Sequence, residues 1–278
     1  MHQKTGRQLL NLLRLSLALV VLYSLVVNCE LDARAQQPFI TDDADVTPKG
    51  KFHFEFSNAF DLLQRSSYPN LKQNTASFEL NYGLPGGVEI GVECPLITIF
   101  NARGSNPRTA FGAGDTNLSV KYNFLPEADG ARRPALSLNV SVELPTGDVS
   151  KQIGSGLTDV WLNTIAQKSL TGHTTWRGNV GILFAGNTAT GAIGIKPRGT
   201  VLTAGTSLVR EFTPKLQLGM EVTGAVTRAT ELGRGQLQML VGGNYEFKKG
   251  MTLDFGVVGG RYAASPRVGA LLGLSVDF

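Results

Sequence analysis

The side chains that could do chemistry in this sequence are mostly acids placed at alternate positions of short apolar segments. Glu93, Glu143 and Glu221 each lie well inside such a segment, and Lys121 and Arg210 are basic residues in comparable places. Side chains two residues apart on an extended strand point to the same face, so each segment has one polar and one apolar face. An excess of acids that lines a confined, poorly screened space favours cations. We therefore expect Glu93, Glu143, Glu221, Lys121 and Arg210 to line a lumen.

The sequence does not contain the residue groups of a recognisable enzyme. His53 and Ser57 share one face of a predicted strand, but they are about 13 Å apart along it, too far for proton transfer within that strand. His173 falls in a short turn, and no Gly-x-Ser-x-Gly elbow is present. Cys94 lies on the apolar side of its segment. We expect no catalytic residues and no enzymatic activity.

A carboxylate cluster precedes the first alternating segment. It consists of Asp42, Asp43 and Asp45, and it lacks the full pattern of a calcium-binding loop. Carboxylates near a chain terminus are usually solvated. We therefore expect no metal and no cofactor, and the role of this cluster stays open.

The elements that must position these side chains are predicted to be strands. Leu136, Leu138 and Val140 alternate with Ser137 and Asn139, and comparable alternation recurs along the chain. Most of the alternating segments are close to the roughly 9–11 residues that a tilted membrane strand needs. The predicted strands are 50–60, 74–83, 87–96, 114–124, 134–145, 157–169, 174–185, 199–212, 215–227, 236–247, 250–261 and 267–278.

The connections between these segments are alternately long and short over most of the chain. Short connections such as 171–173 and 213–214 alternate with long ones such as 145–156 and 186–198. Up-and-down bacterial barrels have long external loops and short periplasmic turns, whereas a Greek-key sandwich has no reason for this rhythm. We predict an all-β fold, an up-and-down antiparallel transmembrane β-barrel of about 12 strands. Phe278 ends the last alternating strand, as in the insertion signal of outer-membrane barrels.

The composition excludes several other classes of protein. Charged residues make up 17% of the 278 residues, against roughly 25% in an average soluble domain, and 33 residues are Gly. Apolar residues are nevertheless 42% of the chain. This combination excludes a coiled coil, a disordered tail and a nucleic-acid-binding domain.

The N-terminus is predicted to be a targeting segment. Lys4, Arg7 and Arg14 precede an apolar run over 15–27, which is too short to span a bilayer comfortably. The run is followed by Ala33-Arg34-Ala35, which fits a secretory cleavage site. We expect a cleaved signal peptide over 1–35, a short periplasmic N-terminal segment over 36–49 and an outer-membrane β-barrel over 50–278.

Several short motifs in a fixed order resemble one known family. They are Thr41-Asp42-Asp43-Ala44-Asp45, Gly112-Ala113-Gly114-Asp115-Thr116, Leu144-Pro145-Thr146-Gly147-Asp148 and Gly154-Ser155-Gly156. Over roughly 41 to 278 this order resembles the family called putative MetA-pathway of phenol degradation, outer-membrane barrels often labelled transporters. The resemblance implies an outer-membrane barrel and passage of small, often aromatic molecules, without fixing a substrate.

We expect an outer-membrane channel or transporter for small molecules, aromatic or hydrophobic ones among them. The alternative is a non-conducting structural or interaction barrel, because a barrel of about twelve strands can have a plugged lumen. Basic residues of the long loops, such as Arg65, Arg103 and Lys151, suit lipopolysaccharide phosphates. The expected partners are outer-membrane lipid and lipopolysaccharide, the barrel-assembly machinery through Phe278, and small-molecule cargo, with no nucleic acid. The sequence does not predict the cargo, the openness of the lumen or the oligomeric state.

Overall fold

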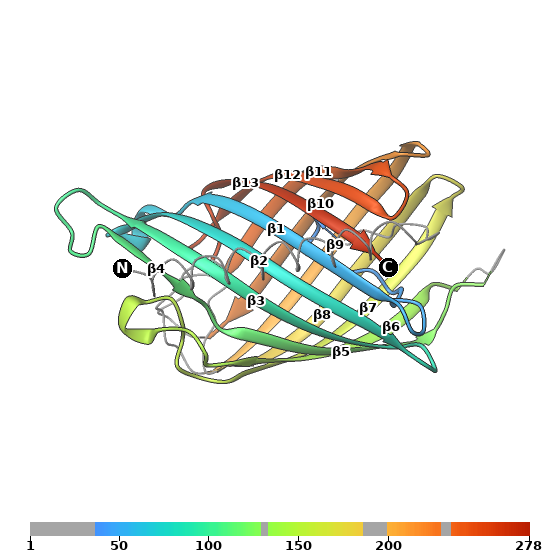
Figure 1. Ribbon diagram of the computed structural model, residues 1–278, viewed down its shortest axis with the longest axis horizontal. Helices are drawn as coiled ribbons and strands as arrows, with labels where there is room; N and C mark the ends of the chain where they lie inside the picture. Colours follow the sequence, from blue (N-terminus) through green and yellow to red (C-terminus); the bar gives the residue numbers. More distant parts are fainter. Residues whose placement is uncertain (1–36, 129–132, 186–198, 229–234) are drawn as a thin grey trace, which may run out of the picture.

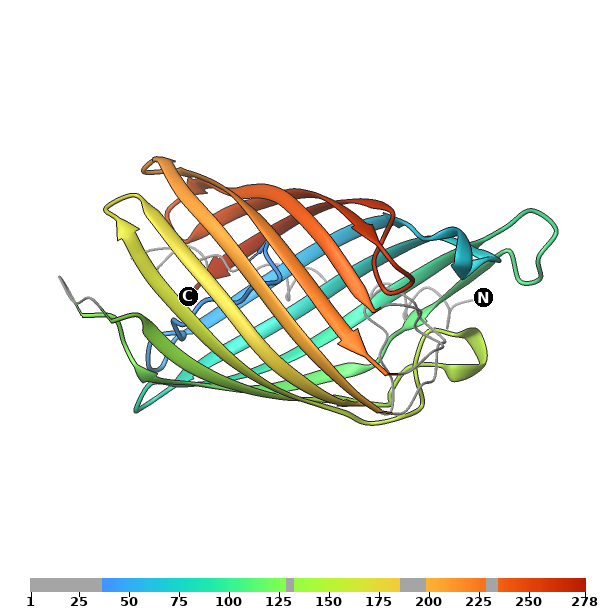
Figure 2. The ribbon, with the colours of Figure 1, turned by 180° about the vertical axis from the view of Figure 1, so that it is seen from behind.

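The chain forms a closed barrel of tilted antiparallel strands (Figures 1 and 2). The computed structural model describes residues 37–128, 133–185, 199–228 and 235–278. The predicted signal peptide over 1–35 lies outside these residues. Among the described residues, no helix has both the length and the apolar character to cross a membrane.

Apart from β4 and β5, which both pair with β3, the strands pair with their neighbours in chain order, and the first pairs with the last. Phe54 of β1 lies opposite Val276 of β13, which closes the barrel. The strands are β1 (Phe52–Leu62), β2 (Asn70–Leu84), β3 (Val88–Asn101), β4 (Thr109–Ala113), β5 (Thr116–Leu125), β6 (Ala135–Leu144), β7 (Asp159–Thr171), β8 (Thr174–Ala185), β9 (Gly199–Thr213), β10 (Leu216–Thr227), β11 (Gln236–Lys248), β12 (Met251–Arg261) and β13 (Val268–Asp277). Two single 3₁₀ turns, Arg65–Ser67 and Val149–Lys151, lie in the connections.

The thirteen strands occupy twelve places around the barrel, because β4 and β5 both pair with β3. Gly114 and Asp115 separate the two, and the Gly114 amide donates to the Pro95 carbonyl at 2.8 Å. The pair β4–β5 is therefore one barrel strand with a break in it. The predicted fold, an up-and-down barrel of about twelve strands, is confirmed.

The two faces of the wall differ as the alternation predicts. Along β5, Leu118, Val120 and Tyr122 are each more than 40% exposed, whereas Lys121 between them is 2% exposed. The outer face is therefore a band of large apolar side chains suited to lipid. At one end of the barrel the ring of Phe52 lies 4.7 Å from that of Tyr82 and 5.5 Å from that of Phe278.

The end that carries Phe52 and Phe278 is the periplasmic end. Both termini of an even-stranded barrel lie on one side, and the short connections β2–β3, β7–β8, β9–β10 and β11–β12 lie on that side as well. Of the described connections, β1–β2, β3–β4 and β6–β7 lie at the opposite, external end.

Candidate functional site in the barrel lumen

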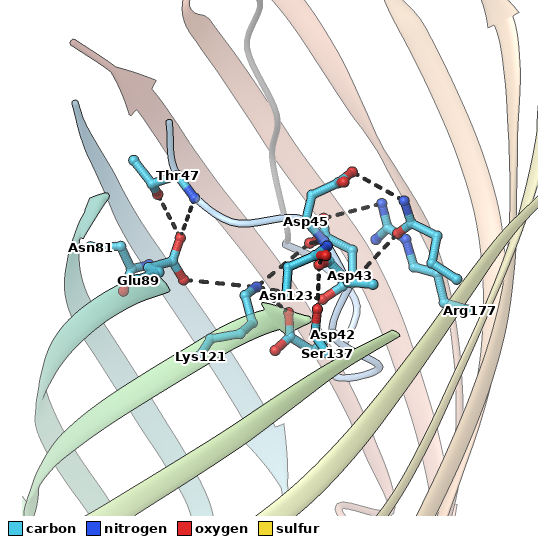
Figure 3. A network of polar contacts seen from close by, with 12 residues as sticks. Asp42, Asp43, Asp45, Thr47, Asn81, Glu89, Lys121, Asn123, Ser137 and Arg177 are labelled. Atoms are coloured by element: carbon cyan, nitrogen blue, oxygen red, sulfur yellow. Dashed lines mark hydrogen bonds and ion pairs between the residues drawn. The ribbon is translucent and has the colours of Figure 1, made fainter. Parts of the chain in front are cut away.

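Residues 37–49, called the inner segment below, lie inside the barrel against its wall (Figure 3). Phe39 packs with the inward-facing Val209 of β9 and Leu240 of β11. Ala44, which is fully buried, packs with side chains of β6 and β7. The sequence does not predict this placement, since 36–49 reads as a short periplasmic segment. These contacts join residues far apart in the chain, and alternation within a strand carries no information about them.

Charged side chains hold the middle of the inner segment. The Lys121 ammonium lies 3.1 Å from Asp42 Oδ1, 3.6 Å from Asp43 Oδ1 and 3.8 Å from Glu89 Oε1. Arg177 of β8 lies 3.5 Å from the other oxygen of Asp43. Lys121 is only 2% exposed, so this cation depends on the carboxylates around it. Figure 3 shows Asp42 and Asp43 between the two basic residues.

Side chains of the wall also satisfy the backbone of the inner segment, which forms no strand or helix of its own. Glu221 accepts hydrogen bonds from the Ile40 amide at 3.1 Å and from the Thr41 amide. Glu89 Oε2 accepts from both the amide and the hydroxyl of Thr47 at 2.6 Å. Ser137 donates to the Ala44 carbonyl. Buried peptide groups need such partners, so the wall is built to hold this segment.

An external loop narrows the lumen from the opposite end. Asp115, at the break between β4 and β5, accepts hydrogen bonds from the Gly147 amide at 2.8 Å and the Ser155 amide at 2.7 Å. Ile153 of the same loop is 2% exposed and packs against Ile97 and other inward-facing residues. The loop between β6 and β7 therefore rests on the inner wall.

A cavity of about 600 Å³ remains in the lumen beside the inner segment. The wall of β1–β3 lines it with carboxylates, and the wall of β5–β8 lines it mainly with amides and hydroxyls. The inner segment contributes apolar side chains together with those of Gln37, Thr41 and Asp42. Representative lining residues are Glu79, Glu93, Asn139, Trp161, Leu240 and Ile40. A cavity of this size and mixed lining suits a small organic molecule.

The structure places four of the five predicted lumen residues inside. Glu93 lines the cavity. Glu143 lies on the lumen face opposite Asp159, and it is close enough to Glu93 for electrostatic interaction. Lys121 and Glu221 hold the inner segment.

Arg210 lies on the outer face, contrary to the expectation. Its guanidinium carbon is 5.8 Å from the centre of the Phe212 ring. The preceding residue on β9, Val209, packs on Phe39 inside the barrel and therefore points inward. Because neighbouring side chains point to opposite faces, Arg210 must point outward. It lies near the periplasmic end of its strand, where a long basic side chain can reach the water interface.

His53 lies between two carboxylates and contacts no nucleophile among the described residues. Its Nδ1 is 2.6 Å from Asp277 and its Nε2 is 2.8 Å from Glu55. Both ring nitrogens are thus engaged, so neither is available as a base for Ser57. Cys94 is exposed on the outer side.

Sequence reasoning missed the inner-segment side chains as functional residues. Asp42 and Asp43 read as a solvated acidic cluster, whereas in the structure they are the counter-charges of Lys121 and Arg177. The sequence contained one clue. Lys121 and Arg177 are isolated basic residues on a largely acidic lumen face, and the acids Asp42 and Asp43 stand just before the first strand.

Comparison with solved structures shows the same architecture. The COG4313 outer membrane channel from Pseudomonas putida F1 superposes with a TM-score of 0.67 at 15% identity, covering 85% of this chain and 98% of that one. The NanC porin gives a TM-score of 0.54 at 9% identity, covering 80% and 98%. The KdgM porin gives 0.51 at 10% identity, covering 81% and 99%. At such low identities these likenesses establish the fold, that of outer-membrane channel barrels.

The family comparison covers nearly all of the barrel. No curated protein matches the chain. The family described as "Putative MetA-pathway of phenol degradation" matches residues 35–278, and the chain therefore belongs to that family.

Proposed function

We propose that this member of the phenol-degradation family is an outer-membrane channel for small molecules, aromatic or hydrophobic ones among them. The observation that carries the proposal is the cavity of about 600 Å³ inside a closed barrel. Trp161, Leu240 and Val258 give this cavity an apolar side, which suits an aromatic cargo. The family description points to the same class of molecule. No catalytic role is part of the proposal.

The inner segment would act as the constriction of this channel. It follows the inner wall from contacts with Leu240 of β11, through Glu221 of β10 and Arg177 of β8, to Glu89 of β3. A segment in this position narrows the periplasmic half of the lumen. The rate of transport would then depend on the strength of the contacts that hold the inner segment to the wall, such as those of Lys121, Arg177 and Glu221.

The second candidate is a non-conducting structural or interaction barrel. The same contacts favour it, because the buried Lys121 cluster and Glu221 could hold the lumen permanently closed. In either case the basic external loops would face lipopolysaccharide phosphates, and Phe278 would guide assembly.

Planar-bilayer conductance separates the two candidates. The wild-type barrel is compared with the double variant Asp42→Asn/Asp43→Asn, which removes the acidic anchors without altering any strand. A channel predicts measurable conductance in the wild type and a larger one in the double variant. The control is Glu211→Gln, a change at the periplasmic end of β9 outside the inner segment and the external loop. No conductance in any of these proteins would establish the closed structural barrel.

A further inference from the structure

A row of carboxylates crosses the lumen wall in direct register. Glu55 of β1 lies opposite Glu79 of β2, and Glu79 lies opposite Glu93 of β3. Residues directly opposite on neighbouring strands have their Cβ atoms about 4.5–5.5 Å apart, and like charges in such pairs are destabilising. The row continues through Asn117 of β5 to Glu143 of β6 and Asp159 of β7. The wall therefore carries a concentration of acidic side chains, and a bound cation would relieve the repulsion between their charges.

The centre of this row has no basic counterpart on the wall. His53 contacts Glu55 at 2.8 Å, and Asn81 donates a hydrogen bond to Glu79 at 2.9 Å. Within the part of the chain that the structure describes, Glu79 and Glu93 have no basic side chain within ion-pair distance. Lys121 and Arg177 are engaged by the inner segment. Glu79 and Glu93 both line the cavity, so a cation bound there would supply the counter-charge that the wall does not.

The opposite sides of the same cavity suit an organic body. Ile40 lines the cavity and is 58% exposed, although it lies inside the barrel. Trp161 and Leu240 line it as well. The Thr223 hydroxyl also belongs to the lining; Thr223 is 8% exposed, and its oxygen has no hydrogen-bond partner among the described residues. The cavity thus offers acids, apolar surface and an unused hydroxyl together.

We propose that this cavity binds small organic cations, with an ammonium group against Glu79 and Glu93 and an apolar body against Ile40 and Trp161. The acids form a line along the wall and do not surround a point, and among the described residues no group of three could hold a metal ion. A compact inorganic cation would leave the apolar side of the cavity unused. This inference rests on the proposed channel function and narrows its cargo to one chemical class.

The test is isothermal titration of the full barrel in detergent with three probes. These are 2-phenylethylammonium, its neutral analogue 2-phenylethanol, and ethylammonium, which lacks the ring. We expect 2-phenylethylammonium to bind at least tenfold more tightly than either of the others. In Glu79→Gln/Glu93→Gln its affinity should fall to that of 2-phenylethanol. The control Glu211→Gln changes an acid at the periplasmic end of β9 and should bind like the wild type. Heat-modifiable migration in electrophoresis verifies that each variant is folded.

Three results would overturn the inference. Equal binding of the ammonium and the alcohol would show that charge does not select the ligand. Equal binding of the two ammonium probes would show that the apolar side contributes nothing. Unchanged affinity in the folded double variant would show that the carboxylate row is not the site. Because binding is measured without transport, a barrel that binds but does not conduct would refute the channel and leave the site standing.

Discussion

At the scale of single residues, Lys121 accounts for the position of the inner segment. Its ammonium is buried among Asp42, Asp43 and Glu89 at 3.1–3.8 Å. Removing one partner of a buried ion pair typically costs roughly 3–5 kcal/mol, because the remaining charges are left uncompensated. In Lys121→Met the acids of the inner segment would be repelled by Glu89 and would leave the wall.

Thiol labelling can follow that release. In a Cys29→Ser/Cys94→Ser background, Thr41→Cys leaves one thiol in the chain, at a position that is 1% exposed. We expect Lys121→Met to speed its reaction with a membrane-impermeant thiol reagent at least tenfold. Lys151→Met, which disrupts only the exposed pair with Asp148, is the control and should not change the rate. Equal rates in both variants would mean that Lys121 does not anchor the segment.

A second prediction at this scale concerns which side chains of β6 point to lipid and which point into the lumen. Val140 lies opposite Val120 and Leu162, both exposed on the outer face, whereas Asn139 lines the cavity. Val140→Arg should lower the free energy of unfolding by about 2–4 kcal/mol if its site is near the bilayer midplane. Asn139→Arg should cost less, since it places the charge in the lumen. Denaturant unfolding in lipid vesicles measures the free energy of unfolding of both variants. Equal losses would show that Val140 does not face lipid or that Asn139 does not face the lumen.

Single residues also show where sequence reasoning ends. The inward placement of Glu93, Glu143, Glu221 and Lys121 could be predicted, because period-two alternation relates each residue to its strand neighbours. The Lys121 partners Asp42 and Asp43 could not, because they lie 78–79 residues earlier in the chain. Arg210 shows a further limit: a charged residue near a strand end can point outward, because its long side chain reaches water there.

At the scale of elements, the broken strand β4–β5 positions an external loop. The Asp115 carboxylate accepts from two amides of the loop between β6 and β7. Hydrogen bonds to charged groups contribute about 1.5–3 kcal/mol each. In Asp115→Ala this loop should detach from the inner wall and become sensitive to protease added to intact cells. Asp115→Asn keeps one accepting oxygen, so protease should cleave its loop at an intermediate rate. If the loop resists protease in both variants as it does in the wild type, Asp115 does not hold the loop to the wall.

The sequence predicts this strand only in part. The pattern over 114–124 reads as a strand, whereas Thr109–Ala113 reads as loop because it is short and follows Pro107. Its pairing with Leu96–Phe100 of β3 makes it a strand in the structure. A five-residue alternation carries too little information without the partner strand beside it.

A second element-scale prediction concerns the connection after β5. Although partial burial works in the opposite direction, hydrogen bonds from Lys168 and Ser169 lower the pKa of Glu127 below its usual range. Because the pKa is lowered in the folded state, the contact stabilises the fold fully at pH values above the pKa that Glu127 has in the unfolded chain. This stabilisation is lost as the pH falls through the pKa of the folded state. The effect should be about 1 kcal/mol or less, because the pair is near the surface.

Amide exchange provides the measurement. The Ser169 amide donates to Glu127 at 3.1 Å, so its protection should decrease on acidification to below the ordinary glutamate range. In Glu127→Gln the protection should be lower at neutral pH and should no longer change with pH. A pH dependence that persists in Glu127→Gln would assign the titration to another group.

At the scale of the whole molecule, closure of the barrel depends on the pairing of β1 with β13. The Phe52 amide donates to the Phe278 carbonyl at 2.8 Å, and the Phe278 amide donates to the Phe52 carbonyl at 3.0 Å. The two rings lie 5.5 Å apart on the outer face. Phe278 therefore has two separable contributions, a backbone pair that closes the barrel and a ring at the periplasmic membrane interface.

Phe278→Ala tests the ring alone, because it keeps the backbone pair. An aromatic pair contributes about 0.5–1.5 kcal/mol beyond the area it buries, so refolding of the purified chain into lipid vesicles should lose little yield. If the assembly machinery recognises the terminal ring, the amount of folded barrel in the outer membrane of cells should instead fall several-fold. Deletion of Phe278 removes the backbone pair as well and should reduce both yields. Equal yields of wild type and Phe278→Ala in cells would show that the ring is not the insertion signal, and a matching loss in both settings would assign its role to closure of the barrel.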